Sequence, residues 1–578
     1  MPFGLLLTLL VAAALPAQLS AQLQAPWTAL ARPATRTPTP TGPDISVADL
    51  QSRVYRFAAD SMQGRLMGTP GNAKGAEYIA AELQRLGLEP AGENGTYFQT
   101  LPWKSGELDA SSTLSVGGQT FRACTDFVPR DNGPGTRSLD GVPVVYAGDF
   151  ADAATRLAPA QAAGKVVIVS FSGSVPGNPP LTPNRTLVQN AYVAAAGILV
   201  VSRDALPEES IAQYRQSVQF IDSGEFPPAP AYVYITRAMA EAALGGPLAD
   251  RQAGATGTPF RGEIRFTNTP STVPARNVVA ILRGSDPALR NSYVAVGAHN
   301  DHVGTAPEGV AFDSMYVLNH LFRQQGADDE GAPLTADQQA QVNAVLAQVR
   351  AATGGASARR DSIYNGADDD GSGSMAVLEI AEYLASRPTR PKRSVLFVWH
   401  VGEELGLFGS QWYTDHPTVP RDSIIAQLNI DMIGRGGADD VTGVTLDGAR
   451  IHGGEGYLQL IGSRRLSTQL GDWAEAENRE GNHGLRFDYS LDANGHPQNI
   501  YCRSDHYMYA RYGIPVVFFT TGGHADYHQV TDEPQFLDYP HYAQVTSYIA
   551  ALTQRVANAS ARPVVDHPVP GPNARCRQ

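Results

Sequence analysis

Histidines and carboxylates recur in this chain where a predicted strand ends or a predicted helix begins. The stretch NGADDDGSGSM, at residues 365–375, holds three consecutive aspartates, Asp368, Asp369 and Asp370. Adjacent carboxylates repel one another, so a folded site keeps them together only where a cation compensates their charge. A similar stretch, GADDEG, occurs earlier in the chain, at residues 326–331. The first question is which of the two belongs to a site.

Further polar residues follow predicted strands. They are His299, Asp301, Glu403, Glu404, Asp431, His524, Asp526, Tyr527 and His528. Because ligands of open α/β sheets bind beyond the carboxyl ends of the strands, we expect these side chains to share one crevice. Several carboxylates and histidines in one crevice indicate a divalent metal, and this ligand set suits zinc, manganese or cobalt. Carboxylates can bridge two ions about 3.5–4 Å apart, so a two-metal site is possible.

The segments that would position these residues alternate between strands and helices from about residue 272 onward. Apolar strands are predicted at 276–284, 293–301, 393–404, 424–431 and 513–522, and a helix at 371–386. An amphipathic helix is predicted earlier, at 71–88, where it ends near a glycine. This alternation predicts an α/β fold with a mainly parallel, mixed sheet flanked by helices.

The length of 578 residues predicts more than one domain, at about 150 residues each. The predicted parts are a signal peptide at 1–21, a disordered leader at 22–44, a first catalytic part at 45–130, a small β-rich insert at 131–270, a second catalytic part at 271–560 and a C-terminal tail at 561–578. Residues 305–364 interrupt the second part. Because this insertion leaves from the strand that carries His299, we expect it to lie beside the mouth of the site and narrow it.

Composition limits the location and the partners. The apolar run at residues 3–15 is short for a membrane span and precedes small residues, so it predicts a secretory signal, with an uncleaved anchor as the alternative. We therefore expect a secreted or periplasmic protein without stable membrane association after cleavage.

The net charge of −13 disfavours nucleic acid as a partner. Cys124, Cys502 and Cys576 allow at most one intramolecular disulfide and offer no thiolate metal site.

Six stretches, in the same order, resemble the co-catalytic zinc aminopeptidases of metallopeptidase family twenty-eight (clan MH). They are HND at 299–301, NGADDDGSGSMAVLEIAEYL at 365–384, GEELGLFGS at 402–410, NIDMIG at 429–434, RSDHYMYARYGIPVVFF at 503–519 and DYHQVTDEP at 526–534. Residues 58–99 also resemble the front of that catalytic domain. The β-rich region at 131–270 resembles the protease-associated insert that many members carry.

The resemblance implies two Zn2+ ions per chain and five ligands, namely His299, Asp369, Glu404, Asp431 and His528. In this interpretation Asp369 bridges both ions. His299 and Asp431 complete one metal site, and Glu404 and His528 complete the other.

The resemblance also assigns roles to residues that do not bind metal. Glu403 would act as general base and acid on a metal-bridging hydroxide, and Tyr527 would donate a hydrogen bond to the oxyanion. Asp301 would hydrogen-bond the imidazole of His299 and fix its tautomer. Arg503 would hold the main chain of the substrate, with a structural salt bridge as the alternative.

The implied function is a secreted zinc exopeptidase that hydrolyses the N-terminal peptide bond of peptides. A glutamyl carboxypeptidase of the same fold and a non-catalytic receptor-like ectodomain remain alternatives. Glutaminyl cyclase, a relative with one zinc, is disfavoured by the full ligand set. A serine hydrolase is disfavoured because the sequence has no G-x-S-x-G elbow. Neither the side-chain preference nor the oligomeric state follows from the sequence.

The remaining polar residues near these motifs are expected to be structural. Asp368 and Asp370 would shape their loop through hydrogen bonds to backbone amides. Asp505 and His506 would form a packed polar pair, and His302 and His524 would lie outside the ligand set. GADDEG lacks the strand and helix that surround the second aspartate stretch, so we predict a solvated loop outside the site.

Overall fold

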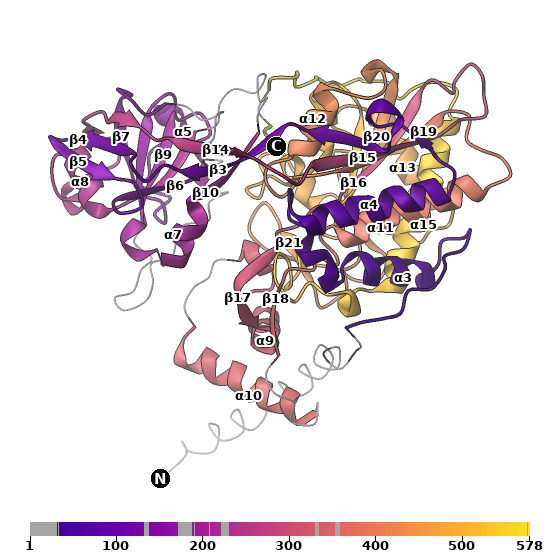
Figure 1. Cartoon of the computed structure of the whole chain (residues 1–578), viewed down its shortest axis with the longest axis horizontal. Helices are drawn as coiled ribbons and strands as arrows, with labels where there is room; N and C mark the ends of the chain where they lie inside the picture. The colour runs from indigo at the N-terminus through magenta and orange to yellow at the C-terminus, as the bar shows by residue number, and fades with distance from the viewer. Residues whose placement is uncertain are drawn as a thin grey trace, which may run out of the picture.

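The computed structural model places a larger lobe beside a smaller one (Figure 1). It describes residues 30, 32, 34–131, 138–171, 188, 189, 191–206, 208–220, 230–329, 334–352, 359–574 and 576–578. The predicted signal peptide lies outside the described residues. The prediction that the leader is disordered as far as residue 44 extends too far. Thr39 N donates to Ser52 Oγ (2.7 Å) and Thr41 Oγ1 donates to Glu382 Oε2 (2.6 Å), so hydrogen bonds attach this segment to two helices.

A mixed sheet, nine-stranded among the described residues, forms the centre of the larger lobe. Its order is β1-β15-β19-β16-β20-β25-β23-β24, with β2 also paired to β15. The strands are β1 (Glu89–Pro90), β2 (Phe98–Leu101), β15 (Ala275–Leu282), β16 (Tyr293–His299), β19 (Ser394–His400), β20 (Ile424–Ile430), β23 (Tyr457–Ile461), β24 (Arg486–Asp488) and β25 (Val516–Thr520). Because β19, β16, β20 and β25 are mutually parallel, their carboxyl ends lie along one edge.

Helices cover both faces of this sheet, which explains why its central strands are apolar throughout. Alternate residues of β19 separate the two layers. Phe397 packs towards one face and Val398 towards the other. The first face carries α3 (Val47–Phe57), α4 (Pro70–Arg85), α11 (Gly371–Ser386), α13 (Thr468–Glu480) and α15 (Tyr539–Asn558), and the second carries α12 (Phe408–Asp415) and α14 (His506–Ala510). The predicted mixed α/β architecture is confirmed.

The smaller lobe has a core of its own, built on a sheet whose described strands number six, in the order β12-β7-β8-β9-β11-β6. Its elements are β4 (Thr113–Val116), β5 (Gln119–Arg122), β6 (Phe127–Asp131), β7 (Val144–Asp149), α5 (Pro159–Ala162), β8 (Val166–Ser170), β9 (Gly197–Val201), α7 (Glu208–Tyr214), β11 (Ala231–Ile235), α8 (Arg237–Leu244), β12 (Thr256–Gly257) and β13 (Arg261–Glu263). Figure 1 shows β3 (Trp103–Leu108), β10 (Gln216–Phe220) and β14 (Phe266–Pro270) between this lobe and the larger one.

The strand pairings show that the smaller lobe begins earlier than residue 131, which is the boundary predicted from the sequence. β3 pairs with both β10 and β14, and β6 pairs with β11. Strands before the expected boundary therefore complete sheets whose other strands come after it. The assignment of this lobe as a protease-associated insert remains a prediction.

The insertion at 305–364 forms a small subdomain on the larger lobe. β17 (Thr305–Ala311) and β18 (Arg360–Ile363) pair antiparallel at its base. Between them lie α9 (Phe312–Phe322), the 3-10 turn η6 (Gly326–Asp328) and α10 (Ala336–Ala352). Apolar side chains of α9 and α10 pack with Val530 and Phe536 of the larger lobe. The insertion is thus attached to the loop that follows β25.

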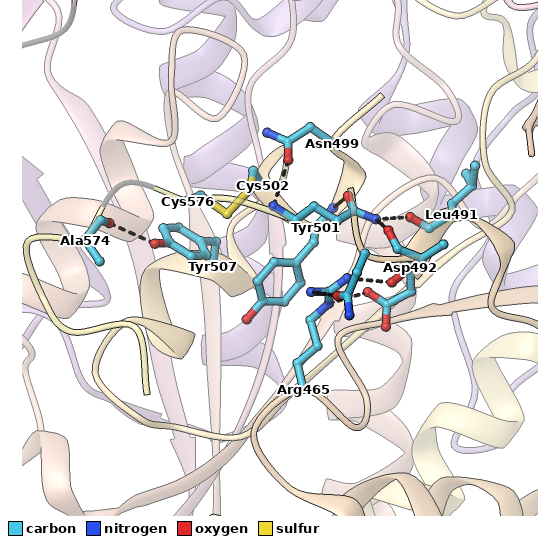
Figure 2. The surroundings of a disulfide bond; sticks show 12 residues. Arg465, Leu491, Asp492, Asn499, Tyr501, Cys502, Tyr507, Ala574 and Cys576 are labelled. Carbon is cyan, nitrogen blue, oxygen red and sulfur yellow. Dashed lines mark hydrogen bonds and ion pairs between the residues drawn. A yellow bond between two sulfur atoms is a disulfide. The ribbon is translucent and has the colours of Figure 1, made fainter. Parts of the chain in front are cut away.

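A disulfide joins Cys502 to Cys576 (Figure 2). Nearby, Tyr507 Oη donates to the carbonyl oxygen of Ala574 (2.8 Å), and Tyr501 N donates to Gln578 Oε1 (2.9 Å). These contacts resolve which cysteines pair and hold the last described segment against the loop that leads to Arg503. Within the described part of the chain, no helix has both the length and the apolar character that a membrane crossing requires.

Candidate metal centre

The carboxyl edge of the parallel strands brings the predicted ligands together. His299 ends β16, and its Nε2 lies 3.1 Å from Asp369 Oδ1 and 3.7 Å from Asp431 Oδ1. On the other side of Asp369, His528 Nε2 lies 2.9 Å from Asp369 Oδ2 and 2.9 Å from Glu404 Oε2. The two oxygens of Asp369 therefore face different histidines, one in each direction.

The arrangement of donor atoms fits metal ions better than hydrogen bonds. The Nε2 atoms of His299 and His528 are buried and have no hydrogen-bond partner among the described residues, although carboxylate oxygens lie close to them. Potential ligand atoms form two groups, each within 4.8 Å, that share Asp369. The groups are His299, Asp369 and Asp431, and His302, Asp369, Glu404 and His528. Imidazole nitrogen together with carboxylate oxygen is the donor chemistry that zinc accepts.

The loop that presents Asp369 is held by its two neighbours. Asp370 caps α11, because its Oδ1 accepts from Gly373 N (2.8 Å), and its Oδ2 accepts from His299 N (3.0 Å). Asp368 Oδ1 accepts from Ser372 Oγ (2.8 Å) and from Gly434 N (2.7 Å). The prediction that Asp368 and Asp370 shape the loop is confirmed, and only Asp369 directs both of its oxygens towards the two ligand groups.

The same loop is fixed from behind by Asp532. Its carboxylate accepts from the backbone N–H groups of Asp368 (3.1 Å) and Asp369 (3.1 Å). The peptide bond between Asp369 and Asp370 is cis. Asp532 belongs to the DYHQVTDEP stretch, so one segment supplies both this support and His528.

Burial and mutual charge perturb the acid–base properties of the cluster. Burial opposes the charged imidazolium of His528, yet Glu404 and Asp369 raise its pKa well above its usual range. Burial raises the pKa of Glu403 well above its usual range, and the negative charges of Asp431 and Glu404 add to this effect. Such a cluster holds its carboxylates ionised together only when cations or protons compensate them.

Asp301 contacts the imidazole of His299 through its backbone. The carbonyl oxygen of Asp301 lies 3.2 Å from His299 Nδ1, whereas its carboxylate Oδ1 lies 3.7 Å away, beyond hydrogen-bonding distance. The same Oδ1 instead accepts from Glu403 N (3.2 Å). Asp301 therefore positions the backbone of Glu403 as well as the imidazole.

A cavity opens in front of this cluster. The described residues that line it include Gln325, Asp328, Asp369, Glu403, Glu404, Asp431, Met432, Thr442, Leu491, Gln498, Ile500, Arg503, Ser504, Phe518, Thr520 and Tyr527. Arg503 Nη2 donates to Tyr527 Oη (3.1 Å), so these two predicted residues lie together at one wall. Apolar side chains line another part of the cavity.

The prediction that GADDEG is a solvated loop outside the site is wrong for Asp328. Arg503 Nη1 donates to Asp328 Oδ2 (2.7 Å) and Arg503 Nη2 donates to Asp328 Oδ1 (3.2 Å), at the wall of the cavity. The sequence does show that the insertion follows directly after the strand that carries His299. This order predicts that the insertion lies near the site, but it does not predict which of its side chains reaches the cavity.

Two further histidines, His302 and His524, were predicted to lie outside the ligand set, and the structure places them differently from each other. His302 Nδ1 lies 2.6 Å from Glu404 Oε1, so His302 belongs beside the second ligand group. Its place directly after HND in the sequence was the available signal. His524 Nε2 lies 3.3 Å from Asp368 Oδ2, behind the aspartate loop.

The prediction that Asp505 and His506 form a packed polar pair is wrong. Asp505 Oδ2 instead lies 3.2 Å from the buried His400 Nδ1. The ring of His506 stacks on Phe518, and burial lowers its pKa to about 3. Consecutive residues at a helix start point in different directions, so adjacency in sequence did not make them partners.

Residues 277–553 match the family model described as Peptidase family M28. The chain contains a peptidase family M28 domain. This M28 domain runs from β15 into α15 and includes every site residue named from the sequence. The predicted family is therefore confirmed for residues 277–553.

Curated relatives of the M28 domain match over short stretches. Leupeptin-inactivating enzyme 1 of Streptomyces exfoliatus is 43% identical over 77 residues, which is 13% of this chain and 18% of that enzyme. A probable leucine aminopeptidase of Arthroderma otae is 40% identical over 75 residues, which is 12% of this chain and 21% of that protein. The chain thus matches about a fifth of the length of these relatives.

Two solved structures align with most of the chain at low identity. The aminopeptidase from Aneurinibacillus sp. strain AM-1 has a TM-score of 0.45 and 15% identity over 92% of this chain and 98% of its own. A zinc aminopeptidase from Bacillus subtilis has a TM-score of 0.44 and 15% identity over 91% of this chain and 99% of its own.

Proposed function

We propose that the protein is a zinc-dependent aminopeptidase that removes N-terminal residues from peptides. The observation that carries this proposal is the pair of ligand groups that share Asp369 beside Glu403 in one cavity. The M28 domain supports peptidase chemistry, and the matched relatives include a probable leucine aminopeptidase. A secreted or periplasmic location stays a prediction.

The proposed centre holds two Zn2+ ions. Asp369 would contribute one carboxylate oxygen to each ion, in keeping with its two histidine contacts. His299 and Asp431 would complete one set of ligands, and Glu404 and His528 would complete the other, beside His302. When bound, the ions supply Lewis acidity, which polarises the scissile carbonyl and lowers the pKa of water.

Glu403 is the proposed general base and acid. It lines the cavity next to the ligands, and its backbone N–H is held by Asp301 (3.2 Å). Its carboxylate takes a proton from the attacking water and passes it to the nitrogen of the leaving amine.

Tyr527 is the proposed donor to the oxyanion. Arg503 Nη2 donates to Tyr527 Oη at 3.1 Å, which uses a lone pair of the hydroxyl and leaves its hydrogen able to point at the substrate. Such a donor stabilises the negative charge that develops on the scissile carbonyl oxygen. Arg503 thereby orients Tyr527 in addition to facing the cavity.

The cavity also suggests which N-terminal side chains are accepted. Met432, Leu491, Ile500 and Phe518 provide apolar surface, while Glu403 and Asp431 provide negative charge. An apolar side chain would bury surface against the first group, and the α-ammonium of the substrate would lie near the carboxylates. Leucine and methionine are therefore expected to be preferred over aspartate and glutamate.

A substrate panel tests the proposal. Leucine p-nitroanilide should be hydrolysed, whereas its N-acetyl derivative should not, because the acetyl group removes the α-ammonium. Chelation should abolish turnover, and zinc should restore it. Equal hydrolysis of blocked and free substrates, or turnover that survives full metal removal, would contradict an aminopeptidase that depends on zinc.

A further inference from the structure

The insertion at 305–364 supplies a charged residue to a site whose other charged residues, among those described, lie outside the insertion. Asp328 and Arg503 meet through two hydrogen bonds, at 2.7 and 3.2 Å, with both side chains about a quarter exposed (27% and 26%). This paired geometry is among the stronger charge-assisted contacts. Burial opposes the positive charge of Arg503, but Asp328 helps to raise its pKa well above its usual range.

The position of Asp328 is set by the backbone around it. Ala327 N donates to the carbonyl oxygen of Tyr527 at 3.0 Å. Gly326 adopts φ +57°, and a Cβ placed there would lie 2.5 Å from the same oxygen. Gln498 Nε2 donates to Gln325 Oε1 at 3.1 Å, three residues before Asp328. The residues that directly precede Asp328 are therefore attached to the larger lobe, and they hold Asp328 at this wall.

Arg503 matters because it is the one basic side chain among the described residues that line this cavity. An unpaired guanidinium at a half-buried wall attracts a carboxylate strongly, as it does in sites that bind the C-terminus of a peptide. Paired with Asp328, the guanidinium carries no net charge to the cavity. Its remaining function is to orient Tyr527, which an ion pair permits.

We propose that Asp328 is a specificity-determining residue, which neutralises Arg503 and so excludes carboxylate groups from this wall of the cavity. The inference rests on the proposed function, because it specifies which peptides that site accepts. The insertion would thus favour longer or uncharged peptide chains. Dipeptides, whose free carboxylate comes close to the scissile bond, would be disfavoured.

The test compares leucylglycine with leucylglycinamide, which differ only in the terminal carboxylate. In Asp328→Asn, the ratio of kcat/KM for leucylglycine over leucylglycinamide should rise about tenfold, as expected for a half-buried charge pair. Asp328→Glu keeps the charge and should keep the ratio low. Asp337→Asn makes the same charge change on exposed α10 and should leave the ratio unchanged.

A double-mutant cycle separates specificity from a structural role. In an Arg503→Gln background, Asp328→Asn should no longer alter the ratio, because the guanidinium that it would release is gone. A ratio that stays within about twofold of wild type in Asp328→Asn overturns the inference. A rise that persists without Arg503 overturns it too.

Ligand-binding measurements distinguish failure of the inference about Asp328 from failure of the proposed aminopeptidase function. Should the wild-type protein hydrolyse neither dipeptide, the aminopeptidase proposal fails, and calorimetry with L-leucine and L-leucinamide tests Asp328 instead. Asp328→Asn should then bind L-leucine about tenfold more tightly relative to L-leucinamide. An unchanged relative affinity, or no binding of either ligand, counts against the inference.

Discussion

The two aspartate-rich stretches of this chain have similar sequences but lie in different surroundings. Asp368, Asp369 and Asp370 are buried, at 0–3% exposure, between the carboxyl edge of the sheet and the start of α11. Asp328, in the other stretch, lies on a single 3-10 turn and is 27% exposed. The carboxylates of the first stretch contact backbone amides and histidines, whereas the carboxylate of Asp328 in the second pairs with one arginine at the cavity wall.

This difference shows that surroundings decide what a carboxylate can do. In the buried stretch each aspartate has its own partners, so one carboxylate is free to bridge ligand groups while its neighbours hold the loop. In the second stretch Asp328 pairs with one charged side chain, Arg503, through two hydrogen bonds, so it changes the charge of a cavity wall without supplying a ligand. Substitutions in the two stretches should therefore differ in size and in kind.

The largest expected effect is at Asp369. Asp369→Ala removes the carboxylate shared by both ligand groups, so zinc content should fall and kcat/KM should drop by about a thousandfold or more. Elemental analysis and hydrolysis of leucine p-nitroanilide on the same sample measure both. Full zinc content together with near-normal turnover would contradict the claim that the buried stretch, unlike the other, supplies a metal ligand.

Glu403→Gln is expected to have the next largest effect, and of a different kind. The substitution removes the proposed proton carrier but leaves the ligand groups intact, so turnover should fall by about 10²–10⁴-fold with zinc content unchanged. The pair of variants separates metal binding from proton transfer. If zinc were lost as well, Glu403 would belong with the ligands rather than beside them.

Asp370→Ala should act mainly on stability. It removes the cap of α11 and the acceptor for buried His299 N, so the free energy of unfolding of the chelated protein should fall by about 2–4 kcal/mol. Thr236→Ala, which removes only the cap of α8 in the smaller lobe, should cost about 1 kcal/mol. Urea unfolding measures both, and equal losses would contradict the structural role of Asp370.

Gly326→Ala should have the smallest effect and should confirm how the exposed stretch is held. A methyl group there meets the carbonyl oxygen of Tyr527 and should push Asp328 away from Arg503, which raises acceptance of leucylglycine a few-fold, roughly as a partial loss of the ion pair would. Gly448→Ala is the matched control, since it has φ +87° but nothing within 4 Å. Identical behaviour of both variants would show that strain alone, not displacement, is responsible.

The sequence predicts local elements well and distant contacts poorly. The helices predicted at 371–386 and 71–88 agree closely with α11 and α4, because apolar spacing and capping residues act within a few turns. The convergence of His299, Glu404 and Asp431 followed from strand ends, since parallel strands share an edge. These predictions needed only periodicity and sheet geometry.

Contacts between distant segments could not be predicted in the same way. Asp328 and Arg503 are 175 residues apart, and their pairing depends on how the insertion folds back onto the loop after β25. The contact of His302 with Glu404 spans 102 residues and depends on the turn after HND. The early boundary of the smaller lobe follows from β3, which pairs with strands more distant in sequence.

The central claim is that Asp369 joins two metal sites into one catalytic centre. Titration of the metal-free protein with Zn2+, followed by calorimetry and by hydrolysis of leucine p-nitroanilide, tests it most directly. Binding should saturate at two zinc ions per chain, and full activity should appear only at that ratio. Saturation at one ion with full activity, or activity that does not respond to zinc, would contradict the account.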